Sequence, residues 1–233
     1  MQARTPQYST DSKRGLPPQT PGNYDSSRQI IVDTAFEILW QKGYNGTRVD
    51  EIIERTPFTK GAFYHHFPSK KALVSAVIDE IIGGMMHKRW ATPLKQSTTP
   101  LATLIALLDG CRRDGEKGVR RGCPLNNLAQ ELSCTDDEIR AQVNNYFQEW
   151  IAAFEDAIAR AQLLGQAKAD VTPRVVAIRI VAAYEGAVSL AKAARDPEAL
   201  NVVLDNLIAY LRGLQSPPHL VDLDATNQTN PTI

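Results

Sequence analysis

One stretch of the 233-residue sequence decides the fold, Thr59-Lys60-Gly61-Ala62-Phe63-Tyr64-His65-His66-Phe67-Pro68-Ser69-Lys70. Thr59 can cap a very short helix, and Ser69 can cap the helix after it. The short helix starts with small groups and one cation, at 60–62, so its backbone can enter the DNA major groove, which is about 12 Å wide. Phe63 and Phe67 are expected to anchor the other side of this helix in a small core.

Two further helices are expected before this stretch. A Ser with a Gln three residues later, at 26–29, is typical of a capping box. Gly43 can end that first helix in a left-handed conformation. Thr47 with Asp50 opens a second short helix, which Pro57 stops. Three short helices with a tight turn between the last two form the pattern of a helix-turn-helix.

The rest of the chain also predicts helices, so the expected fold class is all-α. Apolar residues recur at helical spacing, and no alternating strand pattern interrupts them. The expected helices cover about 101–113, 124–132 and 136–164, a segment beginning at 172–173, and 196–213. Gly83-Gly84 lies in the helix that begins after Ser69, where it could form a hinge or mark the place where that helix frays or ends.

Composition excludes several classes of protein. The chain has 26 basic and 26 acidic residues and no net charge. No run approaches the roughly 18 apolar residues of a membrane span, and the N-terminus lacks the apolar core of a secretory signal. We therefore expect a cytoplasmic protein with no membrane partner. Three cysteines without close pairs fit neither a disulfide scaffold nor a zinc site, and we expect no metal and no cofactor.

Charge alone does not establish a DNA-binding head. Between Ser26 and Trp90 the sequence has nine basic and seven acidic residues, an excess of only two positive charges. A DNA-binding protein needs a local basic surface rather than a basic average. The adjacent His65 and His66 point to different helix faces without a third ligand nearby, which argues against a metal site.

The run Gly43-Tyr44, Thr47 and 59–70 resembles the TetR family of bacterial regulators, over about 28–82. The resemblance implies DNA contacts along the second and third helices and at the start of the fourth. The residues carried over are Thr47, Arg48, Thr59, Lys60, Gly61, Ala62, Tyr64, His65, His66 and Lys70. The family often has Gly where this chain has Pro57, and proline fixes φ near −65°, so we expect a different turn geometry.

The resemblance also implies a C-terminal domain that encloses a small-molecule pocket and forms a homodimer. The segment 121–129 is similar to the start of a helix in one branch of such domains. The pocket candidates are Cys123, Asn126, Phe147, Trp150, Phe154, Tyr184 and Glu185. The aromatic stripe would equally suit a plain core. Cys123 follows two arginines, which could lower the pKa of its thiol and make it a sensor, or it could be a small apolar residue.

The expected division is a disordered tail at 1–25, a helix-turn-helix domain at 26–82, a ligand-binding and dimerisation domain at 83–214, and a flexible tail at 215–233. The expected function is sequence-specific transcriptional regulation, by a repressor that an unknown small-molecule effector releases from its operator. A C2 dimer would place its recognition helices about 34–36 Å apart on double-stranded DNA with a near-palindromic operator.

Three alternatives to this reading stay open. An activator or a corepressor-dependent regulator would share the same head. An all-α enzyme would need a catalytic constellation, and the sequence shows no such motif. A non-specific DNA-architectural protein would leave the large second domain without a role.

Overall fold

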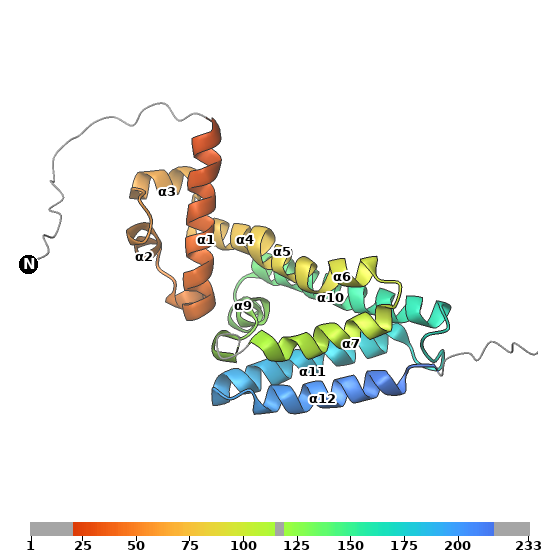
Figure 1. Ribbon diagram of the computed structural model, residues 1–233. Helices are drawn as coiled ribbons and strands as arrows, with labels where there is room; N and C mark the ends of the chain where they lie inside the picture. Colours follow the sequence, from red (N-terminus) through yellow and green to blue (C-terminus); the bar gives the residue numbers. More distant parts are fainter. Residues whose placement is uncertain (1–20, 115–118, 217–233) are drawn as a thin grey trace, which may run out of the picture.

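The computed structural model describes residues 21–114 and 119–216, which form helices in two packed groups (Figure 1). The all-α prediction is confirmed. Among the described residues the only β-type pairing is one isolated bridge between Ala167 and Gln215. None of the described helices is long and apolar enough to cross a membrane.

Four helices build the N-terminal head: α1 (Pro21–Gly46), α2 (Val49–Glu54), α3 (Lys60–His66) and α4 (Lys70–Val77). The Thr59 hydroxyl accepts a hydrogen bond from the Ala62 amide at 3.3 Å, and the Ser69 hydroxyl accepts one from the Ala72 amide at 3.1 Å. Both side chains satisfy amides that would otherwise lack a partner at a helix start. The expected caps of α3 and α4 are thereby confirmed.

The expected starts of the first two helices are wrong. Helix α1 begins at Pro21, so Ser26 lies inside it and is not at its start. At α2 the residue before the helix is Arg48, while the Thr47 hydroxyl donates to the Gly43 carbonyl at 2.7 Å. Gly43 interrupts the helix with φ 72° and ψ 179°, a conformation open to glycine, but this ψ is extended and not the expected left-handed helical value.

A long helical rod connects the head to the rest of the molecule. After α4 it continues through the π-helical turn η1 (Ile78–Ile82), α5 (Gly83–Met86), the π-helical turn η2 (His87–Ala91) and α6 (Thr92–Gln96). The backbone stays right-handed helical at each junction, so the helix does not end at Gly83-Gly84. A Cβ on Gly83 would lie 2.5 Å from Tyr146 Cε1, so this glycine permits the close approach of that ring.

The C-terminal group contains α7 (Pro100–Gly110) with the 3-10 turn η3 (Cys111–Asp114), α9 (Pro124–Leu132), α10 (Asp137–Leu163), α11 (Pro173–Ala194) and α12 (Glu198–Gly213). The expected bounds of α9 and α10 agree with the structure. The Asp136 carboxylate caps α10 by accepting from the Glu138 and Ile139 amides. In Figure 1, α7, α11 and α12 lie side by side below α10.

The apolar interior has two parts, and α9 belongs to the head. The core of the head includes Leu125, Leu128 and Leu132 from α9, together with Ile139 and Val143 from the start of α10. The expected boundary after residue 82 therefore separates the head from residues that complete its core. The expected tails lie outside the described residues, except that 21–25 belong to α1 and 215–216 pair with 166–168.

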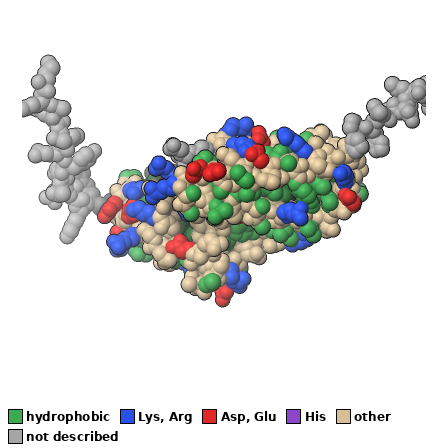
Figure 2. All heavy atoms as spheres, turned by 90° about the horizontal axis from the view of Figure 1, so that it is seen from below, with side chains coloured by type: hydrophobic (Ala, Val, Ile, Leu, Met, Phe, Trp, Pro, Cys, Tyr) green, Lys and Arg blue, Asp and Glu red, His purple; other side chains and the backbone are tan. Residues whose placement is uncertain are grey.

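One face of α11 and α12 exposes apolar and small side chains to solvent. In Figure 2, hydrophobic side chains gather on the underside of the molecule, where these two helices lie. Val175 is 59% exposed, Leu190 61% and Val202 52%. Ala182 and Gly186 are exposed between them on α11. A contiguous exposed apolar patch often marks a site of association with another molecule.

Candidate DNA-binding helix and ligand cavity

Helix α3 has one buried face and one exposed face. Phe63 and Phe67 are 1% and 3% exposed and anchor the helix in the head, as the sequence predicted. Tyr64 is 46% exposed, and His65 and residues 59–61 are exposed as well. The small residues at the start of α3 leave its backbone open to approach by a groove edge.

Lys60 carries the positive charge of this exposed face. Its ammonium nitrogen lies 3.0 Å from Asp50 Oδ1 on α2, and both side chains are largely exposed. Hydrogen bonding to Asp50 raises the pKa of Lys60, so the side chain stays cationic. Exposed ion pairs are weak, so a DNA phosphate or base edge can replace this carboxylate.

Two of the residues predicted to contact DNA, Thr47 and Lys70, make contacts within the head. Thr47 is 2% exposed, whereas Arg48 beside it is exposed. The Lys70 ammonium donates to the Thr47 carbonyl at 2.9 Å and lies 4.1 Å from the centre of the Tyr44 ring. Burial lowers the pKa of Lys70. In this structure Lys70 ties the start of α4 to the turn before α2.

His66 points back toward α1. A hydrogen bond of 3.0 Å joins its Nε2 to the Ser27 hydroxyl, and burial lowers the pKa of His66. Within the described part of the chain no group of three or more His, Cys, Asp or Glu side chains is placed to hold a metal ion. The structure thus exposes one set of the expected DNA contacts and turns Thr47, His66 and Lys70 inward. The exposed set is Arg48, Thr59, Lys60, Gly61, Tyr64 and His65, with Ala62 half-buried.

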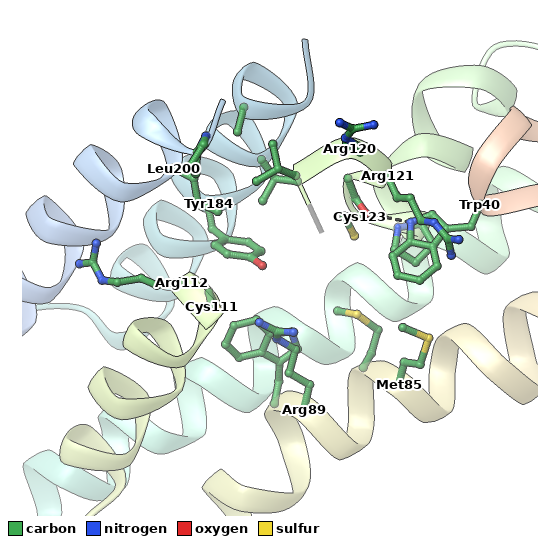
Figure 3. A pocket seen from close by; sticks show the side chains of 18 of the residues that line it. Trp40, Met85, Arg89, Cys111, Arg112, Arg120, Arg121, Cys123, Tyr184 and Leu200 are labelled. Carbon is green, nitrogen blue, oxygen red and sulfur yellow. Dashed lines mark hydrogen bonds between the residues drawn. The ribbon is translucent and has the colours of Figure 1, made fainter. Parts of the chain in front are cut away.

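A cavity of about 1210 Å³ lies in the C-terminal group, next to the head (Figure 3). The connecting rod, the start of α9, and helices α10, α11 and α12 all contribute to its lining. All three tryptophans of the chain, Trp40, Trp90 and Trp150, line it. Trp90 stacks on Trp150 with ring centres 5.2 Å apart, and Tyr184 meets Trp90 edge-on at 5.7 Å. Such an apolar, aromatic cavity is typical of a small-molecule site.

The structure brings three of the expected pocket residues to this cavity: Cys123, Trp150 and Tyr184. The four other candidates do not line it: Asn126, Phe147, Phe154 and Glu185. Phe154 is completely buried and packs edge-on against Trp90 at 5.4 Å, so it supports the cavity wall from behind. The Asn126 side chain donates to the Ser189 hydroxyl.

Cys123 is not activated by the arginines that precede it. Burial raises the pKa of its thiol well above the usual value, and the nearby Glu185 carboxylate raises it further. The raised pKa does not fit a reactive sensor thiol and agrees with the other alternative, a small apolar residue packed against the core. Glu185 itself is 7% exposed, and burial raises its pKa to about 7, while Cys123 and Asn126 limit the rise.

Sequence reasoning missed several residues of the cavity. Arg89, Arg112 and Arg195 line it, and they come from the connecting rod, η3 and the end of α11. No local pattern distinguishes these arginines from the other basic residues of the chain. Only the packing of the helices brings them to one place.

Helix α9 links the cavity to the head at both of its ends. The Trp40 indole donates to the Gly122 carbonyl at 2.9 Å, directly at the cavity (Figure 3). At the other end, the two Glu131 carboxylate oxygens accept from the Tyr44 and Asn45 amides, both at 2.6 Å. A displacement of the cavity wall can thus reach the turn that leads into α2.

Two protein-family models match the chain. Residues 31–77 match "Bacterial regulatory proteins, tetR family", and residues 100–207 match "Tetracyclin repressor-like, C-terminal domain". The chain is 30% identical over 194 residues to the transcriptional regulator AcuR of Cereibacter sphaeroides, covering 81% of this chain and 86% of that one. It is 28% identical over 184 residues to the HTH-type transcriptional repressor DhaR of Mycobacterium sp. (strain GP1), covering 76% and 88%.

Solved structures share this architecture over about four fifths of the chain. The regulatory protein TetR from Rhodobacter sphaeroides has a TM-score of 0.71 and 27% identity, covering 79% of this chain and 98% of that one. A TetR transcriptional regulator from Chloroflexus aurantiacus has a TM-score of 0.73 and 27% identity, covering 82% and 97%. Its head, its helical C-terminal group and these likenesses show that the chain belongs to the TetR family of DNA-binding transcriptional regulators.

Proposed function

We propose that this protein is a cytoplasmic repressor that occupies a near-palindromic operator as a homodimer and leaves it when a small molecule fills the cavity. One observation carries the proposal. The same helix, α9, begins at an aromatic cavity and ends on the turn that positions the exposed recognition helix. The likeness to DhaR, a protein named as a repressor, supports repression rather than activation.

The coupling follows from how α9 is held. A ligand in the cavity contacts residues 122–124, at the start of α9. Helix α9 is buried against the head through three leucines and bound to it through Glu131. A ligand that favours a shifted α9 therefore favours a shifted head, and the two recognition helices of a dimer no longer match successive major grooves. Such a ligand must bind the two arrangements with unequal affinity.

The exposed apolar face of α11 and α12 is the proposed dimer contact. Gly186 lies in this face, and a Cβ there would meet nothing within 4 Å in its own protomer. Gly186→Leu should leave the fold of one chain intact while it obstructs a helix packed against it. We expect light scattering to give a dimer for the wild type and a monomer for Gly186→Leu. Dimeric wild type with an equally dimeric variant would place the contact elsewhere.

Selection of binding sites from random duplex DNA at near-physiological salt tests the DNA-binding proposal. We expect enrichment of a near-palindrome whose half-sites are about one helical turn apart. Binding without enrichment would favour an architectural protein. Binding only after addition of a small molecule would favour a corepressor-dependent regulator.

The role of α3 can be tested with two lysine variants. Lys60→Ala should weaken binding to the selected operator by on the order of tenfold and change the sequence preference. Lys95→Ala is the matched control, because Lys95 is an exposed lysine on α6, far from α3 in Figure 1. Equal effects of the two substitutions would contradict a direct role for Lys60.

A further inference from the structure

The cavity becomes more cationic from its floor to its mouth. Its fully buried lining includes Trp90, Trp150 and Leu200 and contains no charged side chain. Its exposed lining residues include Lys88, Arg120 and Arg195, together with Met85 and Pro197. No Asp or Glu is among the described lining residues.

Half-exposed arginines lie between these two zones, and their charges are partly compensated. The Arg121 guanidinium lies 2.9 Å from Glu37 Oε2, and the Arg112 side chain pairs with Asp109 and Asp205. The charges of Lys88, Arg120 and Arg195 have no ion pair with any carboxylate of the described residues. The side chains that line the mouth thus carry positive charge and, among the described residues, no negative charge. A cleft lined by charge of one sign raises the local concentration of oppositely charged ligands.

The backbone of Arg195 has an unfavourable, left-handed conformation. It follows the last turn of α11 with φ 56° and ψ 33°, in the left-handed region. Glycine or asparagine is usual at such a helix end because a larger side chain is strained there. Among the described residues Arg195 is the only non-glycine with positive φ. A strained residue with its cation at a cavity mouth indicates a role for that side chain beyond ending a helix.

Tyr184 offers a neutral polar group deeper in the cavity. Figure 3 shows Tyr184 and Arg89 pointing into the same central space from opposite walls. Burial raises the pKa of Tyr184 well above its usual value, so its hydroxyl stays protonated and can donate a hydrogen bond. A ligand oxygen in this space would find a donor.

We propose that the effector of this cavity is an amphipathic organic carboxylate, whose apolar body packs against the aromatic floor while its anionic group lies at the mouth formed by Lys88, Arg120 and Arg195. The inference rests on the proposed function, since it names the chemical class of the ligand for the same cavity. A neutral apolar ligand would leave the cations at the mouth unused, and a cationic one would be repelled by them.

Decanoate, decanamide and decylamine test this selectivity, because they share one chain and differ in charge. Their binding can be followed by intrinsic fluorescence, since all three tryptophans line the cavity. We expect decanoate to bind at least about tenfold more tightly than decanamide and decylamine to bind most weakly. Added salt should weaken the binding of decanoate alone. Equal affinities, tighter binding of decanamide, or no binding of any of the three would overturn the inference.

The double variant Arg120→Gln/Arg195→Gln should reduce the affinity for decanoate to that for decanamide and leave decanamide binding unchanged. Arg174→Gln is the control, because Arg174 is an exposed arginine at the start of α11 that does not line the cavity. An unchanged preference for decanoate in the double variant would overturn the role of the mouth.

Failure of this inference is distinguishable from failure of the proposed function. If decanoate binds selectively but does not release the selected operator, the carboxylate site stands and release by ligand fails. If decanamide releases the operator as well as decanoate does, release by ligand stands and the carboxylate inference fails.

Discussion

Neutralising Glu131 tests the link between α9 and the head. Its carboxylate accepts two backbone hydrogen bonds of 2.6 Å, from the Tyr44 and Asn45 amides. Hydrogen bonds to a charged group contribute about 1.5–3 kcal/mol each, and neutral ones about 0.5–1.5 kcal/mol. In Glu131→Gln the side-chain carbonyl can keep one neutral bond, while the amide nitrogen turns toward the other donor. The free energy of unfolding then falls by about 2–4 kcal/mol, and we expect the lower end of this range because the carboxylate is half-exposed.

For a chain of this size a loss of about 2 kcal/mol lowers Tm by about 4–8 °C. Glu149→Gln provides the matched control, because its carboxylate is 52% exposed and contacts only His87 among the described residues. We expect that control to change stability by less than about 0.5 kcal/mol. Differential scanning calorimetry measures both variants against the wild type. Equal values of Tm for Glu131→Gln and the control would refute the reasoning.

Hydrogen exchange gives a local readout of the same variant. In the wild type the Tyr44 and Asn45 amides should exchange slowly because Glu131 accepts from both. In Glu131→Gln at least one of them should exchange faster, while amides inside α11 should not change. Unchanged exchange at both positions would show that the carboxylate does not hold this turn.

Four further substitutions test local effects on stability. Gly83→Ala should be destabilising because its Cβ would lie 2.5 Å from the Tyr146 ring. A Cβ on Gly84 would meet nothing within 4 Å, so Gly84→Ala should stabilise the protein by up to about 1 kcal/mol. Thermal unfolding of the two variants tests this difference. Gly43→Ala should cost about 1–3 kcal/mol because φ is 72° and ψ 179° there, a region that is essentially limited to glycine, and a loss below about 0.5 kcal/mol would contradict this. Glu185 has its pKa raised by burial to about 7, above the unfolded value of about 4.3, so the folded protein binds this proton more tightly. Its contribution to the free energy of unfolding should fall by up to about 3 kcal/mol between pH 4.3 and 7, and Glu185→Gln should remove that part of the slope in chemical denaturation.

Most of the helices, including α3, could be predicted from local sequence patterns. Caps such as Thr59, Ser69 and Asp136 act on amides within three residues, so their effect is readable locally. The alternation of buried Phe63 and Phe67 with exposed Tyr64 also follows from helical spacing alone. The expected start of the second helix was wrong because the Thr47 hydroxyl bonds to the Gly43 carbonyl, and the first helix begins earlier than expected, at Pro21.

The cavity and its connection to the head result from the packing of the helices and could not be predicted from the sequence. The lining runs from Trp40 to Asn201, and its members meet only because helices distant in sequence pack together. Periodicity identified an aromatic stripe on α10 but could not tell that Trp150 faces the cavity while Phe154 is buried behind it. Arg121 and the carboxylate of Glu131 carry no local signal, because their hydrogen-bond partners lie more than 80 residues away in the chain. The chemistry of each side chain can be read from the sequence, whereas the assembly of side chains into a site depends on how the helices pack.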